Sequence, residues 1–271
     1  MRSDYNRLTY NFLNYLFLDC FMLVVKVPTS QGSLGKNPSC KNTPEKLIKA
    51  SEEIFLNEKL EEVKFDVGKV DTFDGDIEKT NENIFNSKGD IFLGGDHSIT
   101  YPLFSAFAQA YKNPGIIIFD AHADCVTYFK PPSHEDWVNV LVNDGLVKSE
   151  NVILVGVRNL YKSELEFLRE KNIRFIQAKD IFLNIEETCD FTMELAREFD
   201  GLYLSIDIDV LDPAFAPATG YLEPGGLTTR ELLYFIQRLK RLKNLKRVDL
   251  VEVGDEEKTI KTAAKILAEL I

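Results

Sequence analysis

The chain has 271 residues, 45% of them hydrophobic, and a formal net charge of −11 with a pI near 4.9. This length accommodates one large α/β domain or two small ones. An acidic protein repels phosphate backbones and attracts cations, which argues against nucleic acid as a partner. Ordinary solubility is an equally good explanation of the charge.

The N-terminal apolar stretch runs from Leu16 to Val27 and is interrupted by Asp19 and Lys26. A bilayer-spanning helix needs about 20 residues, so this stretch is too short to cross a membrane. No small-residue cleavage site follows, and we expect no signal peptide. We predict a first core strand within Phe21–Val27 and an N-terminal extension of unclear role over residues 1–22.

Cysteine usage indicates a reducing compartment. None of the four cysteines forms a Cys-x-x-Cys pair with another; they are Cys20, Cys40, Cys125 and Cys189. Nothing in their spacing predicts a disulfide framework, so we expect a cytoplasmic protein.

Apolar runs alternate with helical patterns along most of the chain, which predicts an α/β fold. The predicted strands are Met22–Val27, Val63–Val67, Asp90–Leu93, Gly115–Phe119, Val152–Val157, Ile173–Gln177, Leu202–Ile208 and Arg247–Val253. Ile116–Phe119 is continuously apolar, which is typical of a strand covered on both faces of a parallel sheet.

Amphipathic helices are predicted between the strands. Thr228 and Glu231 form a capping-box pattern, and Thr43 before a proline marks another helix start. Ser133-x-x-Asp136 also resembles a cap, so we predict a helix from there through about Val142. A single three-layer α/β/α domain with a mostly parallel sheet is expected over residues 23–271.

All three histidines lie between positions 97 and 134, and two of them stand beside aspartates that follow apolar runs. In parallel sheets, ligands bind beyond the carboxyl ends of the strands. The alternating spacing would place the donors on one face of an extended backbone. The candidate metal ligands are His97, Asp120, His122, Asp124, Asp207 and Asp209.

These two imidazoles and four carboxylates are too many ligands for one tetrahedral zinc. They suit two metals with shared carboxylates, and nitrogen and oxygen donors without thiolate favour manganese-like ions. Four carboxylates would neutralise two divalent cations. A lone aspartate after a strand is usually a turn former. Two alternating clusters and a histidine after Gly-Gly argue against coincidence.

Three ordered motifs closely resemble the signatures of the ureohydrolases, the arginase and agmatinase family. They are Gly94-Gly-Asp-His97-Ser98, Asp120-Ala-His-Ala-Asp124 and Ser205-Ile-Asp-Ile-Asp through Thr219-Gly220. The resemblance implies an arginase-like fold with an eight-stranded parallel sheet. It also implies a dinuclear manganese centre that hydrolyses guanidino groups to urea and an amine. Family members are commonly trimers or hexamers, so a homotrimer or homohexamer is expected.

By motif position, the resemblance implies one Mn²⁺ on His97, Asp120, Asp124 and Asp207. It implies the second Mn²⁺ on Asp120, His122, Asp207 and Asp209, with Asp120 and Asp207 shared. These ions would supply a hydroxide nucleophile.

The candidate catalytic residues are His134, Glu252 and Asp124. Glu252 matches the family residue that holds the guanidinium over the metals; an ordinary surface glutamate is the alternative. His134 resembles the family's proton-shuttling histidine; a solvent-exposed residue is the alternative. At the first turn of its predicted helix, the helix dipole would keep this imidazole neutral.

The substrate loops depart from the arginase pattern. Val126 stands where arginases carry an asparagine, so the usual grip on the substrate's amino-acid end is missing. Tyr221 replaces a common threonine and is a candidate substrate contact. Lys130 could bind a carboxylate, although a solvated loop charge is the simpler interpretation. The sequence after Glu252 lacks the usual Asn-Pro, which weakens the placement of that glutamate.

These features favour an agmatinase-like hydrolase that acts on a small guanidino substrate. Arginase, a guanidino-acid hydrolase and formimidoylglutamase remain alternatives. Deacetylases of related architecture use a single zinc and a different ligand set. A non-catalytic, metal-bound interaction protein is the alternative outside the enzymes.

Overall fold

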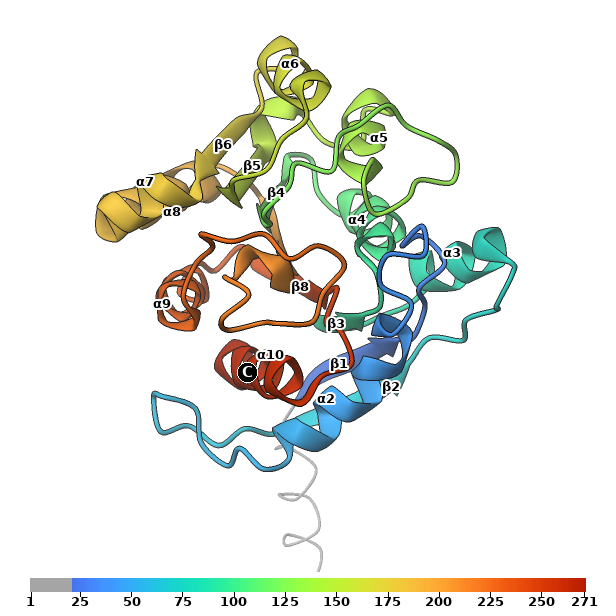
Figure 1. Cartoon of the computed structure of the whole chain (residues 1–271), viewed down its shortest axis with the longest axis vertical. Helices are drawn as coiled ribbons and strands as arrows, with labels where there is room; N and C mark the ends of the chain where they lie inside the picture. Colours follow the sequence, from blue (N-terminus) through green and yellow to red (C-terminus); the bar gives the residue numbers. More distant parts are fainter. Residues whose placement is uncertain (1–20) are drawn as a thin grey trace, which may run out of the picture.

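A single eight-stranded sheet forms the centre of the protein in the computed structural model, which describes residues 21–271 (Figure 1). Its strand order is β2-β1-β3-β8-β7-β4-β5-β6, and every pairing is parallel. The strands are β1 (Met22–Val27), β2 (Phe65–Lys69), β3 (Ile91–Gly94), β4 (Pro114–Phe119), β5 (Val152–Val157), β6 (Arg174–Gln177), β7 (Gly201–Asp207) and β8 (Leu245–Val251). The predicted fold is confirmed; the proposed N-terminal extension lies almost entirely outside the described residues.

Helices cover both faces of the sheet. One layer holds α2 (Thr43–Ser51), α7 (Ala178–Leu183), α8 (Ile185–Arg197), α9 (Thr229–Leu239) and α10 (Glu257–Leu270). The other holds α3 (Ile77–Phe85), α4 (Thr100–Ala108), α5 (Trp137–Asn143) and α6 (Lys162–Glu170). Short 3-10 helices are η1 (Cys40–Asn42), η2 (His97–Ile99), η3 (Ser149–Asn151) and η4 (Ile208–Val210). Within residues 21–271, no helix has the length and apolarity needed to cross a membrane.

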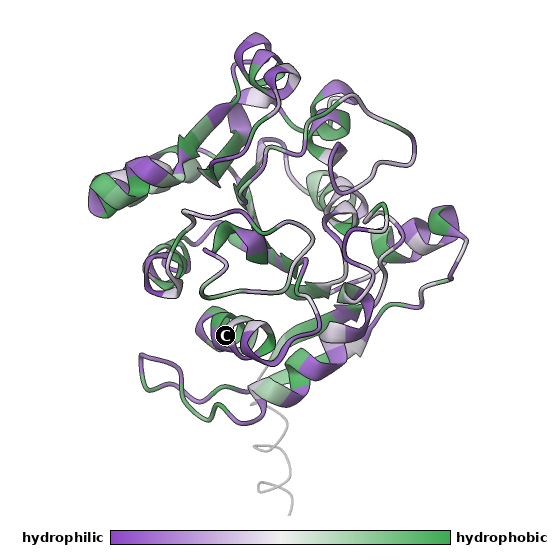
Figure 2. Cartoon of the chain, viewed as in Figure 1, coloured by the Kyte–Doolittle hydropathy of each residue, from purple (hydrophilic) through white to green (hydrophobic). Residues whose placement is uncertain are grey.

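The strands bury side chains on both faces because successive residues point to opposite sides. In β4, Ile117 and Phe119 join the core beneath α9 and α10, whereas Ile116 and Ile118 join the core beneath α4 and α5. Figure 2 shows hydrophilic and hydrophobic residues together on the covering helices, as expected for helices with one face in a core. The sheet is therefore a rigid platform for the loops at its carboxyl edge.

Strands β2 and β8 are each displaced by two residues from their predicted ranges, and β3, β4, β6 and β7 differ by one residue at one or both ends. Strand β2 begins at Phe65 because the backbone N–H of Val63 donates to the Phe55 carbonyl in the preceding loop. Helix α5 begins at Trp137 and not near Ser133. The Asp136 carboxylate accepts hydrogen bonds from the Ser133 backbone N–H and hydroxyl, so this pattern organises a loop before the helix.

Candidate metal centre

Four of the predicted site residues lie at the carboxyl ends of four adjacent central strands. His97 follows β3, Asp120 follows β4, Asp207 ends β7 and Glu252 follows β8. These strands are neighbours in the order β3-β8-β7-β4. Segments that are far apart in the chain therefore meet at one edge of the sheet.

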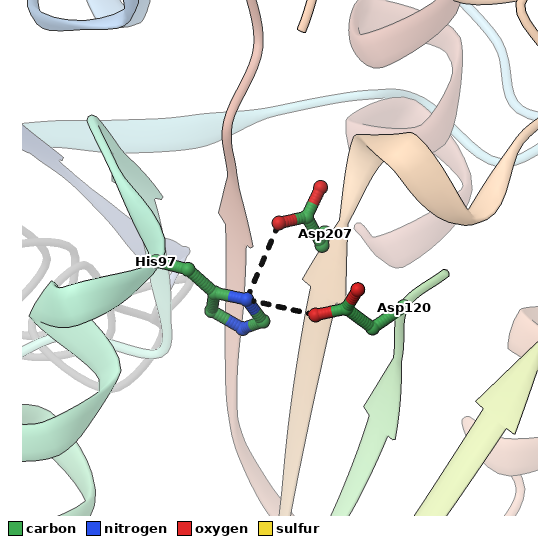
Figure 3. A group of neighbouring side chains, drawn as sticks. All are labelled: His97, Asp120 and Asp207. Carbon is green, nitrogen blue, oxygen red and sulfur yellow. Dashed lines mark ion pairs between the residues drawn. The ribbon is translucent and has the colours of Figure 1, made fainter. Parts of the chain in front are cut away.

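His97 lies at the centre of the deeper group (Figure 3). Its Nδ1 is 3.1 Å from an oxygen of Asp120, 3.0 Å from one of Asp124 and 3.2 Å from one of Asp207. All four side chains are buried, and this Nδ1 makes no hydrogen bond within the described part of the chain. An imidazole nitrogen and three carboxylate oxygens around one point fit the coordination of a cation.

A second group lies beside the first and shares Asp120 with it. His122 Nδ1 is 3.3 Å from Asp120 Oδ1 and 3.0 Å from Asp209 Oδ2. Asp120 therefore directs Oδ1 toward one histidine and Oδ2 toward the other. Each of the two groups could hold a cation, and Asp120 would belong to both.

Tight turns, and not extended backbone, bring these donors together. Asp120 Oδ1 accepts the His122 backbone N–H at 2.6 Å, in the loop after β4. Asp207 caps η4 by accepting the Asp209 backbone N–H at 2.8 Å. The prediction that these donors lie on extended backbone is wrong. In each turn the carboxylate accepts a hydrogen bond from a nearby backbone N–H, and this bond fixes the orientation of the carboxylate.

A buried chain of hydrogen bonds orients His97. Its Nε2 lies 2.9 Å from the Ser205 hydroxyl, which donates to Asp249 at 2.6 Å. Asp249 is fully buried and also accepts the hydroxyls of Tyr203 and Thr100. With Nε2 engaged on this side, Nδ1 is left to face the carboxylates, which is the role that outer hydrogen bonds have in metal sites.

The cluster is electrostatically unfavourable without a cation. Burial, and then the charges of neighbouring aspartates, raise the pKa of Asp207 and Asp209. Burial and the charge of Asp120 raise the pKa of Asp124 to about 7. Carboxylates that hold protons this strongly are ones that a divalent cation would stabilise in the ionised form.

Glu252 and His134 stand together above the aspartates. Glu252 Oε1 accepts the His97 backbone N–H at 3.0 Å and lies 3.0 Å from His134 Nδ1. Both side chains are buried. Burial of the His134 ring lowers its pKa, but the hydrogen bond and the charge of Glu252 outweigh this effect and raise the pKa to about 9. The prediction of a neutral imidazole at a helix start is wrong, because the helix begins three residues later and a carboxylate faces this ring.

A pocket opens above the cluster. Eight of the eleven residues that the sequence singles out as catalytic, metal-binding or substrate-binding candidates, or as the replacement of the arginase asparagine, line this pocket. The lining residues are His122, Asp124, Val126, His134, Glu135, Asn159, Tyr161, Glu164, Asp207, Asp209, Thr219, Gly220, Tyr221 and Glu252. Lys130 is absent from the lining, because its ammonium pairs with Asp144 at 3.1 Å and its side chain is largely exposed.

Two contributors to the site escaped the sequence analysis. Asn37 Nδ2 donates to both the backbone carbonyl and the carboxylate of Glu252, each at 2.9 Å. Arg158 donates to the carbonyls of Asp209, Leu211 and Glu223, which holds the segment after β7 in place. No local pattern marks either residue, since Asn37 lies 215 positions from its partner.

Asp120→Ala should abolish binding at both metal groups, because this carboxylate belongs to each. Elemental analysis of the purified protein and calorimetric titration with Mn²⁺ would measure the metal content. Glu166→Ala, at an exposed position on α6, is the control. Two tightly bound ions in Asp120→Ala would contradict the shared arrangement.

The metal-free protein should lose stability through Asp124 as pH rises from about 4 to 7. The unfolded carboxyl releases its proton near 3.9, whereas the folded one holds it to about 7, so the folded state binds more protons in this interval. Urea unfolding in chelator at pH 5 and pH 7.5 would compare the wild type with Asp124→Asn. The variant should gain stability relative to the wild type at the higher pH; parallel pH profiles would contradict the assignment.

Comparisons with known proteins support the family resemblance of the motifs. The model of the Arginase family matches residues 22–271. An arginase of Staphylococcus aureus is 35% identical over 192 residues, which cover 65% of this chain and 64% of that protein, just under two thirds of its length. An agmatinase of Bacillus cereus is 33% identical over 233 residues, covering 80% of this chain and 78% of that protein.

Solved structures show the same fold. A formimidoylglutamase from Bacillus subtilis aligns with a TM-score of 0.83 at 24% identity, covering 92% of this chain and 85% of that one. A hypothetical agmatinase from Burkholderia thailandensis aligns with a TM-score of 0.82 at 28% identity, covering 93% and 85%. The family resemblance carried by the three motifs is confirmed, and the chain belongs to the arginase family.

Proposed function

We propose that the protein is a ureohydrolase that uses two Mn²⁺ ions to hydrolyse a small guanidino substrate, with agmatine first, to urea and an amine. The observation that carries the proposal is the pair of imidazole–carboxylate groups sharing Asp120 beneath a pocket that Glu252 and His134 line. The proposed ligands of one ion are His97, Asp120, Asp124 and Asp207, and those of the other are Asp120, His122, Asp207 and Asp209.

The metal ions would supply the nucleophile. When bound, two divalent cations lower the pKa of water enough to provide hydroxide at neutral pH. The chain's part is to balance their charge with four buried aspartates. Asp124 contributes to this balance while the Trp137 indole N–H, 2.7 Å from its Oδ2, fixes its orientation.

Glu252 would hold the guanidinium. A planar guanidinium presents paired N–H donors that match a carboxylate. The Glu252 carboxylate is held on one oxygen by the His97 backbone N–H and on the other by Asn37. Because both oxygens are fixed, the carboxylate is ready to orient the reacting carbon before substrate arrives.

His134 would give a proton to the leaving amine. Its Nδ1 faces Glu252, and its Nε2 is buried without a hydrogen-bond partner among the described residues. With a pKa of about 9, the imidazole carries a proton on each nitrogen at neutral pH. Nε2 can therefore act as a general acid toward a group bound in the pocket.

The charge of the pocket favours a substrate with a cationic tail. Among residues 21–271, no lysine or arginine lines the pocket, whereas Glu135, Glu164 and Glu252 do. Arginase, guanidino-acid hydrolase and formimidoylglutamase activities each require a substrate carboxylate, which would find no lysine or arginine there. Val126 in the lining supports the same choice, since it offers no polar contact.

We also propose a cytoplasmic homotrimer or homohexamer. The family resemblance supports the assembly, and three buried cysteines without disulfides, Cys40, Cys125 and Cys189, are compatible with a reducing compartment.

A urea-release assay with Mn²⁺ against agmatine, arginine, guanidinobutyrate and formimidoylglutamate tests the proposed function. Agmatine should give the highest kcat/KM because its tail is cationic. A higher kcat/KM for one of the carboxylate-bearing compounds would identify that compound, and not agmatine, as the preferred substrate. No turnover of any of them, despite two bound ions, would favour a non-catalytic metal-bound protein.

His134→Ala should lower kcat by about a hundredfold or more, which is typical of the loss of a general acid. Metal content should remain at the wild-type level, because His134 belongs to neither metal group. Steady-state kinetics together with elemental analysis would separate the two effects. Loss of metal from the variant would show that His134 is a ligand or a structural residue instead.

A further inference from the structure

Glu135 and Tyr221 form a hydrogen-bonded pair on the pocket wall. The Tyr221 hydroxyl donates to Glu135 Oε1 at 2.5 Å, and both residues line the pocket. The tyrosine ring lies between two histidines of the site: it stacks on His134 with centroids 6.0 Å apart and meets the edge of His122 at 5.4 Å. The pair therefore has a fixed position relative to the metal centre.

The Glu135 carboxylate keeps acceptor capacity for a ligand. Tyr221 occupies Oε1, and no side chain or backbone group in the described part of the chain donates to Oε2. The backbone of Glu135 is held by the Val126 N–H, which donates to its carbonyl at 3.2 Å. A partly exposed carboxylate anchored in this way can accept an ammonium group without reorganising the wall.

Unpartnered polar atoms next to this pair indicate that the wall is built for a ligand. His134 is 95% buried, and its Nε2 has no hydrogen-bond partner in residues 21–271. This nitrogen lies 3.9 Å from Glu135 Oε1, while Nδ1 of the same ring lies 3.0 Å from Glu252. The His134 imidazole therefore lies between the carboxylates of Glu135 and Glu252. A short alkyl chain can span the distance across this ring.

Other charged groups nearby are less suited to bind a substrate tail. Lys36 Nζ lies 5.5 Å from the centre of the Tyr221 ring, but this lysine is exposed and does not line the pocket. Glu223 lies outside the lining and already accepts the Asn159 amide at 2.8 Å. Glu164 is engaged by the backbone N–H groups of Tyr161 and Cys125.

We propose that Glu135, held by the Tyr221 hydroxyl, binds the cationic tail of the substrate and thereby selects alkyl guanidines that end in an ammonium group. The inference rests on the proposed function, because it takes the guanidinium end to lie at Glu252. Glu135 is then the residue that separates agmatine from guanidines with neutral or acidic tails.

The test compares Glu135→Gln with the wild type, both loaded with Mn²⁺, on agmatine and on butylguanidine, which has the same reacting group but a neutral chain. The ratio of kcat/KM for agmatine to that for butylguanidine should fall about ten- to a hundredfold, the range expected for losing one charge-assisted hydrogen bond. The fall should appear mainly in KM for agmatine, because the tail does not react. Glu166→Gln on the exposed face of α6 should leave the ratio unchanged.

Tyr221→Phe provides a second arm, because it removes only the hydroxyl that holds Glu135. The ratio should fall less than in Glu135→Gln. An equal loss on agmatine and butylguanidine in Glu135→Gln would overturn the proposal, since it would place Glu135 in the part of the site that both substrates use. Loss of guanidinobutyrate turnover in Lys36→Gln, with agmatine unaffected by Glu135→Gln, would also overturn it and indicate an acidic tail.

Calorimetric binding of 1,4-diaminobutane, the amine that agmatine would release, separates this proposal from the proposed function. Glu135→Gln should weaken binding about tenfold, whether or not the wild type releases urea. Weakened binding without any urea release would sustain the cation subsite while the hydrolase proposal fails. Urea release with unchanged binding and an unchanged substrate ratio would sustain the hydrolase and overturn the subsite.

Discussion

The concentration of buried negative charge at the carboxyl ends of four central strands governs this structure. Asp120, Asp124, Asp207 and Asp209 are each less than 7% exposed, and two imidazoles supply at most two positive charges among them. Burial disfavours ionised carboxylates and raises the pKa values of Asp124, Asp207 and Asp209. Burial acts on Asp120 in the same direction, but hydrogen bonds with His122 and His97 outweigh it and lower the pKa of this carboxyl. Two divalent cations would match four carboxylates, so the cluster that is unfavourable without metal has the charge that metal binding needs.

The surrounding structure holds this strained arrangement in place. Asp124 and Glu252 have φ angles of 49° and 58°, a region that non-glycine residues rarely occupy and that costs about 1 kcal/mol or more for each. The Trp137 indole N–H holds the Asp124 carboxylate in this conformation. The Asn37 amide holds Glu252 by donating to both its backbone carbonyl and its carboxylate. Asp249 acts from behind through the Ser205 hydroxyl on His97. Long-range contacts therefore set the geometry that the local backbone disfavours.

The difference between local patterns and long-range contacts explains which features could be predicted from the sequence and which could not. The strands were predictable because continuous apolar runs have few alternatives, and the aspartates after Phe119 and Ile206 follow from the strand ends. The start of α5 was missed because the Asp136 carboxylate caps a loop hydrogen-bond network, and not the helix itself. Asn37 and Glu135 were missed because a residue that acts through a distant partner leaves no spacing pattern in the chain.

The floor and the wall of the pocket depend on different parts of the chain. The floor is fixed by the sheet, because moving Asp207 or Asp120 would require moving buried strands. The wall residues Val126, Glu135 and Tyr221 come from loops and not from strands or helices. Such loops can change composition at little cost to the core. Proteins named arginase, agmatinase and formimidoylglutamase can therefore share one fold. In this chain, the features that would select a substrate lie in the charge of the pocket wall and not in the proposed metal ligands.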